Sequence, residues 1–293
     1  MRGAGFVSMA VVGTMPDMSG SVRGYAPVGT GPGLVVISGS SNPQGIGIAA
    51  SMADFPTIAN AVAGFQLTRV GALGGASPTI VESIKRDLRP RVDSLGGSYP
   101  AGTAGAELQM GRVLEAANAG QWGAIAFTAD GVFLDAGSAN GWLNAGYPTT
   151  PPSWLSRFFT AIDAAVVDHS KSSRIWMWDH GNDGNIAAGA SYYTNLVTLA
   201  NLVRLHYGDV GVVIPVLTNK NVSGGLMATV RTAMEAFAMR PDSARVRLVY
   251  IDRLTLRDAA HLADDAAGVE GYCAAGSLYG AACISAANMT ADL

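Results

Sequence analysis

Short apolar runs alternate with amphipathic segments along most of the chain after residue 32. The apolar runs are continuous or nearly so, as buried parallel strands are, and they predict strands over 33–38, 123–128, 173–178, 210–217 and 245–251. The amphipathic segments predict helices over 106–119, 153–169, 190–207, 225–239 and 259–267. Such alternation implies right-handed crossovers and a parallel sheet covered on both faces. We therefore predict an α/β fold, a three-layer sandwich with a central parallel sheet of about five strands flanked by helices.

The first 32 residues follow a different pattern. They are rich in Gly, Pro, Ser and Met and carry few charged side chains. Their apolar stretch is broken by glycines and a serine, unlike that of a signal peptide. A segment so poor in large apolar side chains hardly compensates its own ordering entropy. We expect it to contact a neighbouring chain in a homo-oligomer or larger assembly, or else to lie along its own domain as an edge strand.

Composition and charge narrow the classes of function. Charged residues make up 14% of the 293 residues and the net charge is −3, without a run of Lys or Arg, which argues against a nucleic-acid partner. No run of 18 apolar residues exists, so we expect no membrane-spanning helix. Cys273 and Cys283 fit either two free thiols or one disulfide, and they do not fix the compartment.

The pattern of histidines and serines suggests hydrolytic chemistry. Of four histidines, His261 has an acid three residues earlier, Asp258, a spacing that places both on one side of a helical turn. A serine nucleophile needs such an imidazole and a carboxylate to orient it. Ser41 comes three residues after the end of the first predicted strand, and parallel sheets gather their sites at the carboxyl ends of strands. We therefore predict a Ser41–His261–Asp258 triad.

Each of these residues also has an ordinary structural interpretation. Ser41 lies in a Gly-Ser-Ser-Asn-Pro sequence that makes good turns, and Ser40 is the nearest competing nucleophile. Asp258 can be a helix N-cap, and His261 a surface histidine of the same helix. No spacing of His, Cys and carboxylate residues signals a metal site.

Four segments resemble blocks of the SGNH (GDSL-like) hydrolases, in the expected order over roughly residues 33–270. Residues 34–42 resemble the first block, and their Ser-Asn variant is most similar to the carbohydrate O-acetylesterase branch, which includes sialate-O-acetylesterase-like proteins. Residues 105–111 resemble the Gly-Pro-Glu-Leu segment that follows the second block. Residues 178–183 resemble the third block, and residues 258–261 the Asp-x-x-His of the last.

The resemblance implies a role for each matched residue. Ser41 would be the nucleophile, His261 the general base and Asp258 its orienting carboxylate. The oxyanion hole would consist of the backbone N–H of Ser41, the backbone N–H of Gly105 and the side chain of Asn182. The resemblance implies a domain over residues 33–293 that acts without a cofactor or a metal on a small ester, above all an O-acetylated glycan. Residues 1–32 would then be an extension of that domain.

Several assignments stay open. Other glycines compete with Gly105, namely Gly96, Gly97 and Gly102. The third block here lacks the usual residue between its glycine and Asn-Asp, so Asp183 and Asn185 are alternatives to Asn182. His180 is either a residue of the substrate cleft or a structural histidine.

Two other functions compete with the acetylesterase. One is a non-enzymatic structural or binding protein that keeps the hydrolase fold, such as a component of a viral or surface assembly. The other is a lipase or thioesterase with a different acyl pocket. An extracellular or virion- or surface-associated location is favoured over a cytoplasmic one. A group of aromatic residues is expected in the core, with a sugar-stacking platform as the alternative: Trp176, Trp178, Tyr192 and Tyr193.

Overall fold

The computed structural model describes the parts of the chain that form the sheet, its helices and several loops. These are residues 33–39, 47–48, 62–72, 79–80, 86–88, 103–117, 122–129, 133–137, 141–144, 154–165, 173–180, 191–216, 227–258, 261–264 and 270–288. The expected extension, residues 1–32, lies outside them, so its expected contacts stay predictions.

The centre of the molecule is a parallel sheet. Its five predicted strands are neighbours in the order β10-β9-β8-β1-β7, and every pairing among them is parallel. Their bounds are Gly33–Gly39 for β1, Trp122–Ala129 for β7, Ser173–Asp179 for β8, Gly211–Val216 for β9 and Val246–Tyr250 for β10. The apolar runs of β1 and β9 are buried throughout, as their lack of polar alternation predicts, whereas β10, at the edge of the sheet, is only partly buried.

The sheet extends beyond β7 through strands that the apolar pattern did not predict. β3 (Val62–Ala72) pairs parallel with β7, and two short strands pair antiparallel with β3. These are β4 (Thr79–Ile80) and β5 (Arg86–Leu88). A separate antiparallel pair joins β2 (Gly47–Ile48) to β6 (Thr103–Ala104). The sequence of β3, with two glycines, a glutamine and an arginine, lacks the continuous apolar run that marks its neighbours.

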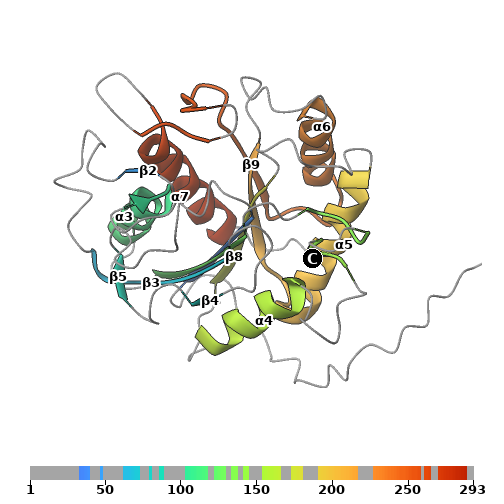
Figure 1. The fold of residues 1–293 in the computed structure, drawn as a ribbon, viewed down its shortest axis with the longest axis horizontal. Coiled ribbons are helices and arrows are strands. Elements are labelled where there is room, and N and C mark those ends of the chain that lie inside the picture. The colour runs from blue at the N-terminus through green and yellow to red at the C-terminus, as the bar shows by residue number, and fades with distance from the viewer. Residues whose placement is uncertain are drawn as a thin grey trace, which may run out of the picture.

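Helices cover both faces of the sheet, which confirms the predicted α/β three-layer sandwich (Figure 1). On one face lie α4 (Trp154–Ala165), α5 (Tyr192–Tyr207) and α6 (Met227–Ala238); on the other lie α3 (Glu107–Ala117) and α7 (Tyr272–Asn288). The alternation of side chains along β1 divides the core between the two faces. Val36 packs in the cluster of α4, α5 and α6, whereas Ile37 packs in that of α3 and α7.

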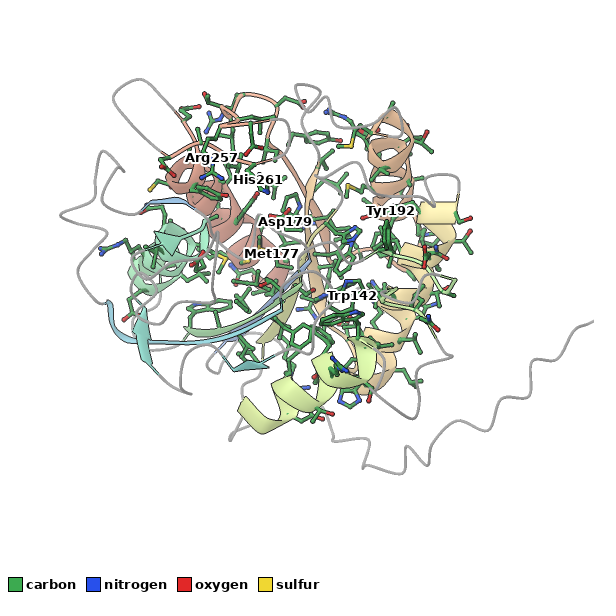
Figure 2. The ribbon with its side chains drawn as sticks, viewed as in Figure 1. Trp142, Met177, Asp179, Tyr192, Arg257 and His261 are labelled. Atoms are coloured by element: carbon green, nitrogen blue, oxygen red, sulfur yellow. The ribbon has the colours of Figure 1, made fainter. Side chains whose placement is uncertain are left out.

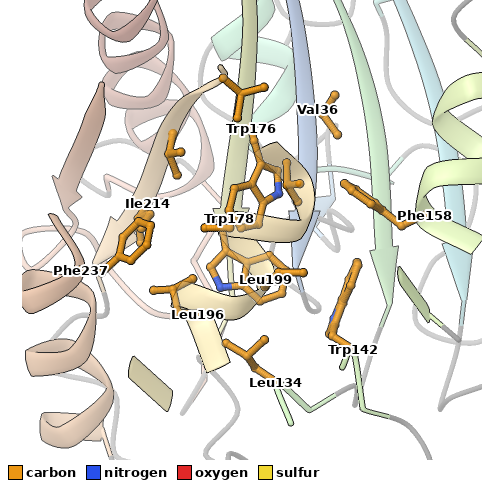
Figure 3. Packing of buried hydrophobic residues seen from close by; sticks show 14 of the residues in the cluster. Val36, Leu134, Trp142, Phe158, Trp176, Trp178, Leu196, Leu199, Ile214 and Phe237 are labelled. Carbon is orange, nitrogen blue, oxygen red and sulfur yellow. The ribbon is translucent and has the colours of Figure 1, made fainter. Parts of the chain in front are cut away.

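Aromatic side chains fill the core beneath α4 and α5. Trp176, Trp178 and Tyr192 are 2%, 0% and 0% exposed, which confirms their interpretation as core residues, while Tyr193 is partly exposed. Figure 3 shows Trp176, Trp178 and Trp142 in this cluster, with apolar side chains around them. The rings of Trp142 and Trp178 meet edge to face, with their centroids 5.2 Å apart.

The predicted helix over 259–267 is wrong where the structure describes it. Residues 261–264 are not helical, and Leu256 forms an antiparallel bridge with Leu262. The backbone N–H of Arg257 donates to the carbonyl of His261 at 2.8 Å, closing a tight loop. Leu262 is 1% exposed, and the burial of its side chain stabilises this loop although the neighbouring alanines favour a helix.

The chain forms its last helix later, at α7, in a Gly-, Ala- and Ser-rich stretch that carried no clear helical periodicity. Its small residues allow close packing against α3. An added Cβ at Gly276 would lie 2.8 Å from Cβ of Gln109, and one at Gly280 would lie 2.7 Å from Cβ of Val113. Both cysteines, Cys273 and Cys283, are on this helix, and no disulfide joins them. None of the helices in the described ranges is long and apolar enough to cross a bilayer.

Candidate active site

The strand order reverses at β1. β1 lies between β7 and β8, and the chain goes to one side of β1 for β3 and β7 and to the other for β8, β9 and β10. In open parallel sheets, ligands bind at the carboxyl ends of the strands beside such a reversal. The register places Gly39 at this end, next to Thr128 of β7 and Asp179 of β8. Ser41 comes two residues after Gly39 and is outside the described residues.

A glycine in an unusual backbone conformation ends β1. Gly39 has φ +142°, in the region that L side chains rarely adopt. A Cβ at this position would also run into the backbone carbonyl of Asp179. The carboxyl end of β1 is therefore in close contact with that of β8.

Asp258 and His261 are joined as the sequence predicted, although on a loop rather than a helix. Nδ1 of His261 lies 2.9 Å and 2.8 Å from the two carboxylate oxygens of Asp258, and the backbone N–H of His261 donates to Oδ1 at 2.9 Å. A carboxylate only accepts, so the pair places the proton of the neutral ring on Nδ1 and leaves Nε2 as its basic atom. This is the geometry of an oriented general base, and its role toward Ser41 stays a prediction.

The loop that carries this pair is fixed to the core beneath it. Leu254 and Leu262 are 0% and 1% exposed and belong to the same apolar cluster as Ile37 and Met177. The carbonyl of Ala263 accepts from the first backbone N–H of α7 at 3.1 Å. Figure 2 shows His261 and Arg257 at the same end of the sheet as Asp179.

Two buried acidic side chains act on Tyr272, the first residue of α7, and this was not predicted. Asp179 and Glu107 are 2% and 4% exposed. Burial raises the pKa of Tyr272 well above its usual range; Arg257 opposes this shift, while the carboxylates of Asp179 and Glu107 add to it. Groups from the loop, from β8 and from α3 therefore act on the same hydroxyl. The one local signal was an aspartate that directly follows an apolar strand, at Trp178-Asp179.

Of the residues predicted for the oxyanion hole, Gly105 is among the described residues, whereas Ser41 and Asn182 are not. Gly105 is buried and lies just before the first turn of α3, beside Ala106 and Glu107. Backbone N–H groups at a helix N-terminus suit an anion, which agrees with the expected role but does not test it. Asn182, with its alternatives Asp183 and Asn185, lies outside the described residues, as do the competing glycines Gly96, Gly97 and Gly102.

His180 follows β8 and is 2% exposed. Its ring stacks on Trp178, with the centroids 4.9 Å apart and the planes at 15°, and its Nδ1 lies 3.3 Å from the hydroxyl oxygen of Tyr192. These contacts favour a histidine integrated in the core, while its position at a strand end keeps it beside the candidate site. His206 lies in the last turn of α5, and its Nε2 is 3.0 Å from a carboxylate oxygen of Asp163 in α4.

The comparisons with known proteins identify the fold. No family model and no curated protein matches the chain. Among solved structures, an Arabidopsis thaliana protein superposes with a TM-score of 0.58 at 14% identity, over 87% of this chain and 98% of its own. A carbohydrate acetylesterase from Xanthomonas citri gives 0.54 at 15%, over 87% of this chain and 56% of its own. The protein NanS gives 0.52 at 14%, over 79% of this chain and 81% of its own. The likeness therefore concerns architecture rather than any particular residue.

Proposed function

We propose that the protein is a serine esterase of the SGNH type that removes O-acetyl groups from a carbohydrate. The observation that carries the proposal is the Asp258–His261 pair, which lies at the same end of the sheet as Asp179, the neighbour of Gly39 in β1 (Figure 2). The fold shared with the Xanthomonas citri carbohydrate acetylesterase supports the class of substrate.

The reaction would proceed in two steps. Nε2 of His261 takes the proton of the Ser41 hydroxyl while its oxygen attacks the ester carbonyl, and Asp258 stabilises the imidazolium that forms. The tetrahedral intermediate expels the sugar alcohol, which receives the proton from His261 and leaves an acetyl group on Ser41. Water, deprotonated by His261, then attacks the acetyl-enzyme, releasing acetate and restoring the serine.

The negative charge on the intermediate needs donors in fixed positions. The proposed donors are the backbone N–H groups of Ser41 and Gly105 and the side chain of Asn182. Removing one donor of an oxyanion hole typically lowers kcat by about 10²–10³. No step in this scheme requires a cofactor.

The deciding experiment measures hydrolysis of p-nitrophenyl acetate by the full chain and by two neighbouring variants. Ser41→Ala should lower kcat by several orders of magnitude, because it removes the nucleophile, while the fold persists by circular dichroism. Ser40→Ala is the matched control and should keep most of the activity. The reverse order of the two variants would move the nucleophile to Ser40.

Two further outcomes separate the competing functions. Faster hydrolysis of an octanoyl than of an acetyl ester would favour the lipase or thioesterase alternative. A wild-type protein that is inert toward every ester, and whose Ser41 is not labelled by a fluorophosphonate in mass spectrometry, would favour a non-enzymatic protein with a hydrolase fold.

A further inference from the structure

The carboxylate of Asp258 has partners on two sides. Both of its oxygens face Nδ1 of His261, and Oδ1 also accepts from the backbone N–H of that residue at 2.9 Å. On the other side, Nε of Arg257 lies 3.7 Å from Oδ2. The backbone therefore fixes Oδ1, and the position of Oδ2 decides how directly the carboxylate faces the ring. The guanidinium of Arg257 attracts this second oxygen.

The backbone around Arg257 is held by hydrogen bonds across the loop. Its own N–H donates to the carbonyl of His261 at 2.8 Å, and the N–H of Ala263 donates to the carbonyl of Thr255 at 2.9 Å. The two segments of the loop are joined in this way on either side of the Leu256–Leu262 bridge. The guanidinium and the imidazole thus extend from backbone positions that are fixed relative to each other.

Arg257 also supplies positive charge to an acidic environment. Burial is the main reason that the pKa of Tyr272 lies well above its usual range; Arg257 opposes this shift, whereas Asp179, Glu107 and Asp264 add to it. These carboxylates come from β8, from α3 and from the loop itself. Of the charged side chains that act on this hydroxyl within the described ranges, Arg257 is the positive one.

We propose that Arg257 is a positioning residue for the catalytic base. Resting on the proposed esterase, in which His261 is the base, Arg257 holds Oδ2 of Asp258 so that the carboxylate stays turned toward Nδ1. Its positive charge also disfavours a second proton on the ring, which keeps Nε2 able to accept the proton of the nucleophile. Arg257 acts through its two neighbours and not on the ester.

The exposure of this ion pair separates a positioning role from a structural one. The side chains of Arg257 and Asp258 are 38% and 46% exposed, so solvent weakens their attraction and the pair adds little to stability. Removal of the guanidinium should therefore change the behaviour of the ring far more than the unfolding of the protein. Arg253 is the matched control, because it lies four residues earlier, is 61% exposed and pairs with Glu270 instead.

The first test follows the protonation of His261 by NMR in the full-length protein. Arg257→Met keeps the apolar stem but removes the charge, so the midpoint of the titration should move to higher pH by roughly half a unit, the effect of one charge screened by solvent. Arg257→Lys keeps the charge and should titrate close to the wild type, as should Arg253→Met. An unchanged midpoint in Arg257→Met, or an equal shift in Arg253→Met, overturns the proposal.

This titration needs no turnover. A protein that hydrolyses no ester, but whose His261 responds to Arg257→Met as expected, would contradict the proposed function and leave the action of Arg257 on the ring in place. The reverse result, an active esterase whose His261 does not respond, would contradict only the role of Arg257.

The second test measures hydrolysis of p-nitrophenyl acetate at a pH above all of these midpoints, where the ring is neutral in every variant. Arg257→Met should lower kcat several-fold with little change in KM, because the carboxylate is less firmly oriented. Arg257→Lys should recover part of the loss, and Arg253→Met should match the wild type.

Two outcomes of the kinetic test would overturn the positioning role. The first is an unchanged kcat in Arg257→Met. The second is a raised KM with kcat intact, which would mean that Arg257 binds the ester directly. Unfolding in urea serves as the structural control: a loss of activity matched by a lowered unfolding midpoint, with a normal titration of His261, would show that Arg257 only stabilises the loop.

Discussion

Gly39 lets the backbone of β1 lie close to that of β8, two residues before the candidate nucleophile Ser41. We predict that Gly39→Ala destabilises the protein, because its φ of +142° costs an L residue about 1–3 kcal/mol and the new Cβ meets the carbonyl of Asp179 as well. The midpoint of urea unfolding measures the loss, and ester hydrolysis should fall with it. Gly137→Ala is the control, since a Cβ there meets nothing within 4 Å.

A Gly39→Ala protein as stable and as active as Gly137→Ala would mean that β1 and β8 do not approach this closely. Loss of activity with stability intact is also informative. It would show that the glycine matters for directing Ser41 rather than for holding the two strands together.

The residues of the candidate site differed in how far the sequence could predict them. Asp258 and His261 are three residues apart, so their pairing was predicted, although it forms on a loop and not on the helical turn assumed for it. Asp179 and His180 owe their environment to residues distant in sequence, Tyr272 and Tyr192 respectively. Short-range patterns carry no information about such contacts, and the burial of these two side chains could not be inferred from them.

The secondary structure shows the same division. The central strands and helices α3 to α6 follow from apolar runs and amphipathic periodicity. The strands β2 to β6 and the helix α7 were not predicted, and the helix expected over 259–267 is wrong. α7 is built from small residues whose use becomes clear only against α3, where Gly276 and Gly280 allow the two helices to approach.

The close packing of α3 on α7 can be tested by filling it. We predict that Gly280→Leu lowers the free energy of unfolding by about 1–3 kcal/mol, because its side chain must displace Val113 and the backbone of Met110. Ala281→Leu is the matched control: it adds a similar side chain at the next, exposed position of the same helix. Chemical denaturation followed by tryptophan fluorescence compares the two.

The Gly280→Leu variant also bears on the site, because α3 begins two residues after Gly105. Moving α3 should lower kcat for ester hydrolysis more than it changes KM. If Gly280→Leu and Ala281→Leu prove equally stable, the two helices are not as tightly packed as described.

The order of the strands favours a binding site at the carboxyl end of the sheet beside β1, independently of the reaction. β1 is central, the strand order reverses around it, and the loops after β1 and β8 begin side by side at Gly39 and Asp179. The loop with Asp258 and His261 is fixed to the same end through Leu262 and α7. Three segments distant in sequence therefore contribute to one end of the sheet, and the specificity for an acyl group depends on how the chain completes that end.

Residues 1–32 raise the question of what the protein assembles with. Their composition, with few charges and few large apolar side chains, favours contact with another surface over an independent fold. We predict that deleting 1–32 shifts the protein to a monomer, measured by light scattering coupled to size exclusion, while kcat on p-nitrophenyl acetate stays within about twofold, because every residue assigned to the reaction lies after residue 33. The same mass with a lowered unfolding midpoint would instead indicate an edge strand of its own domain. Unchanged mass and unchanged stability would contradict both roles and leave the extension dispensable.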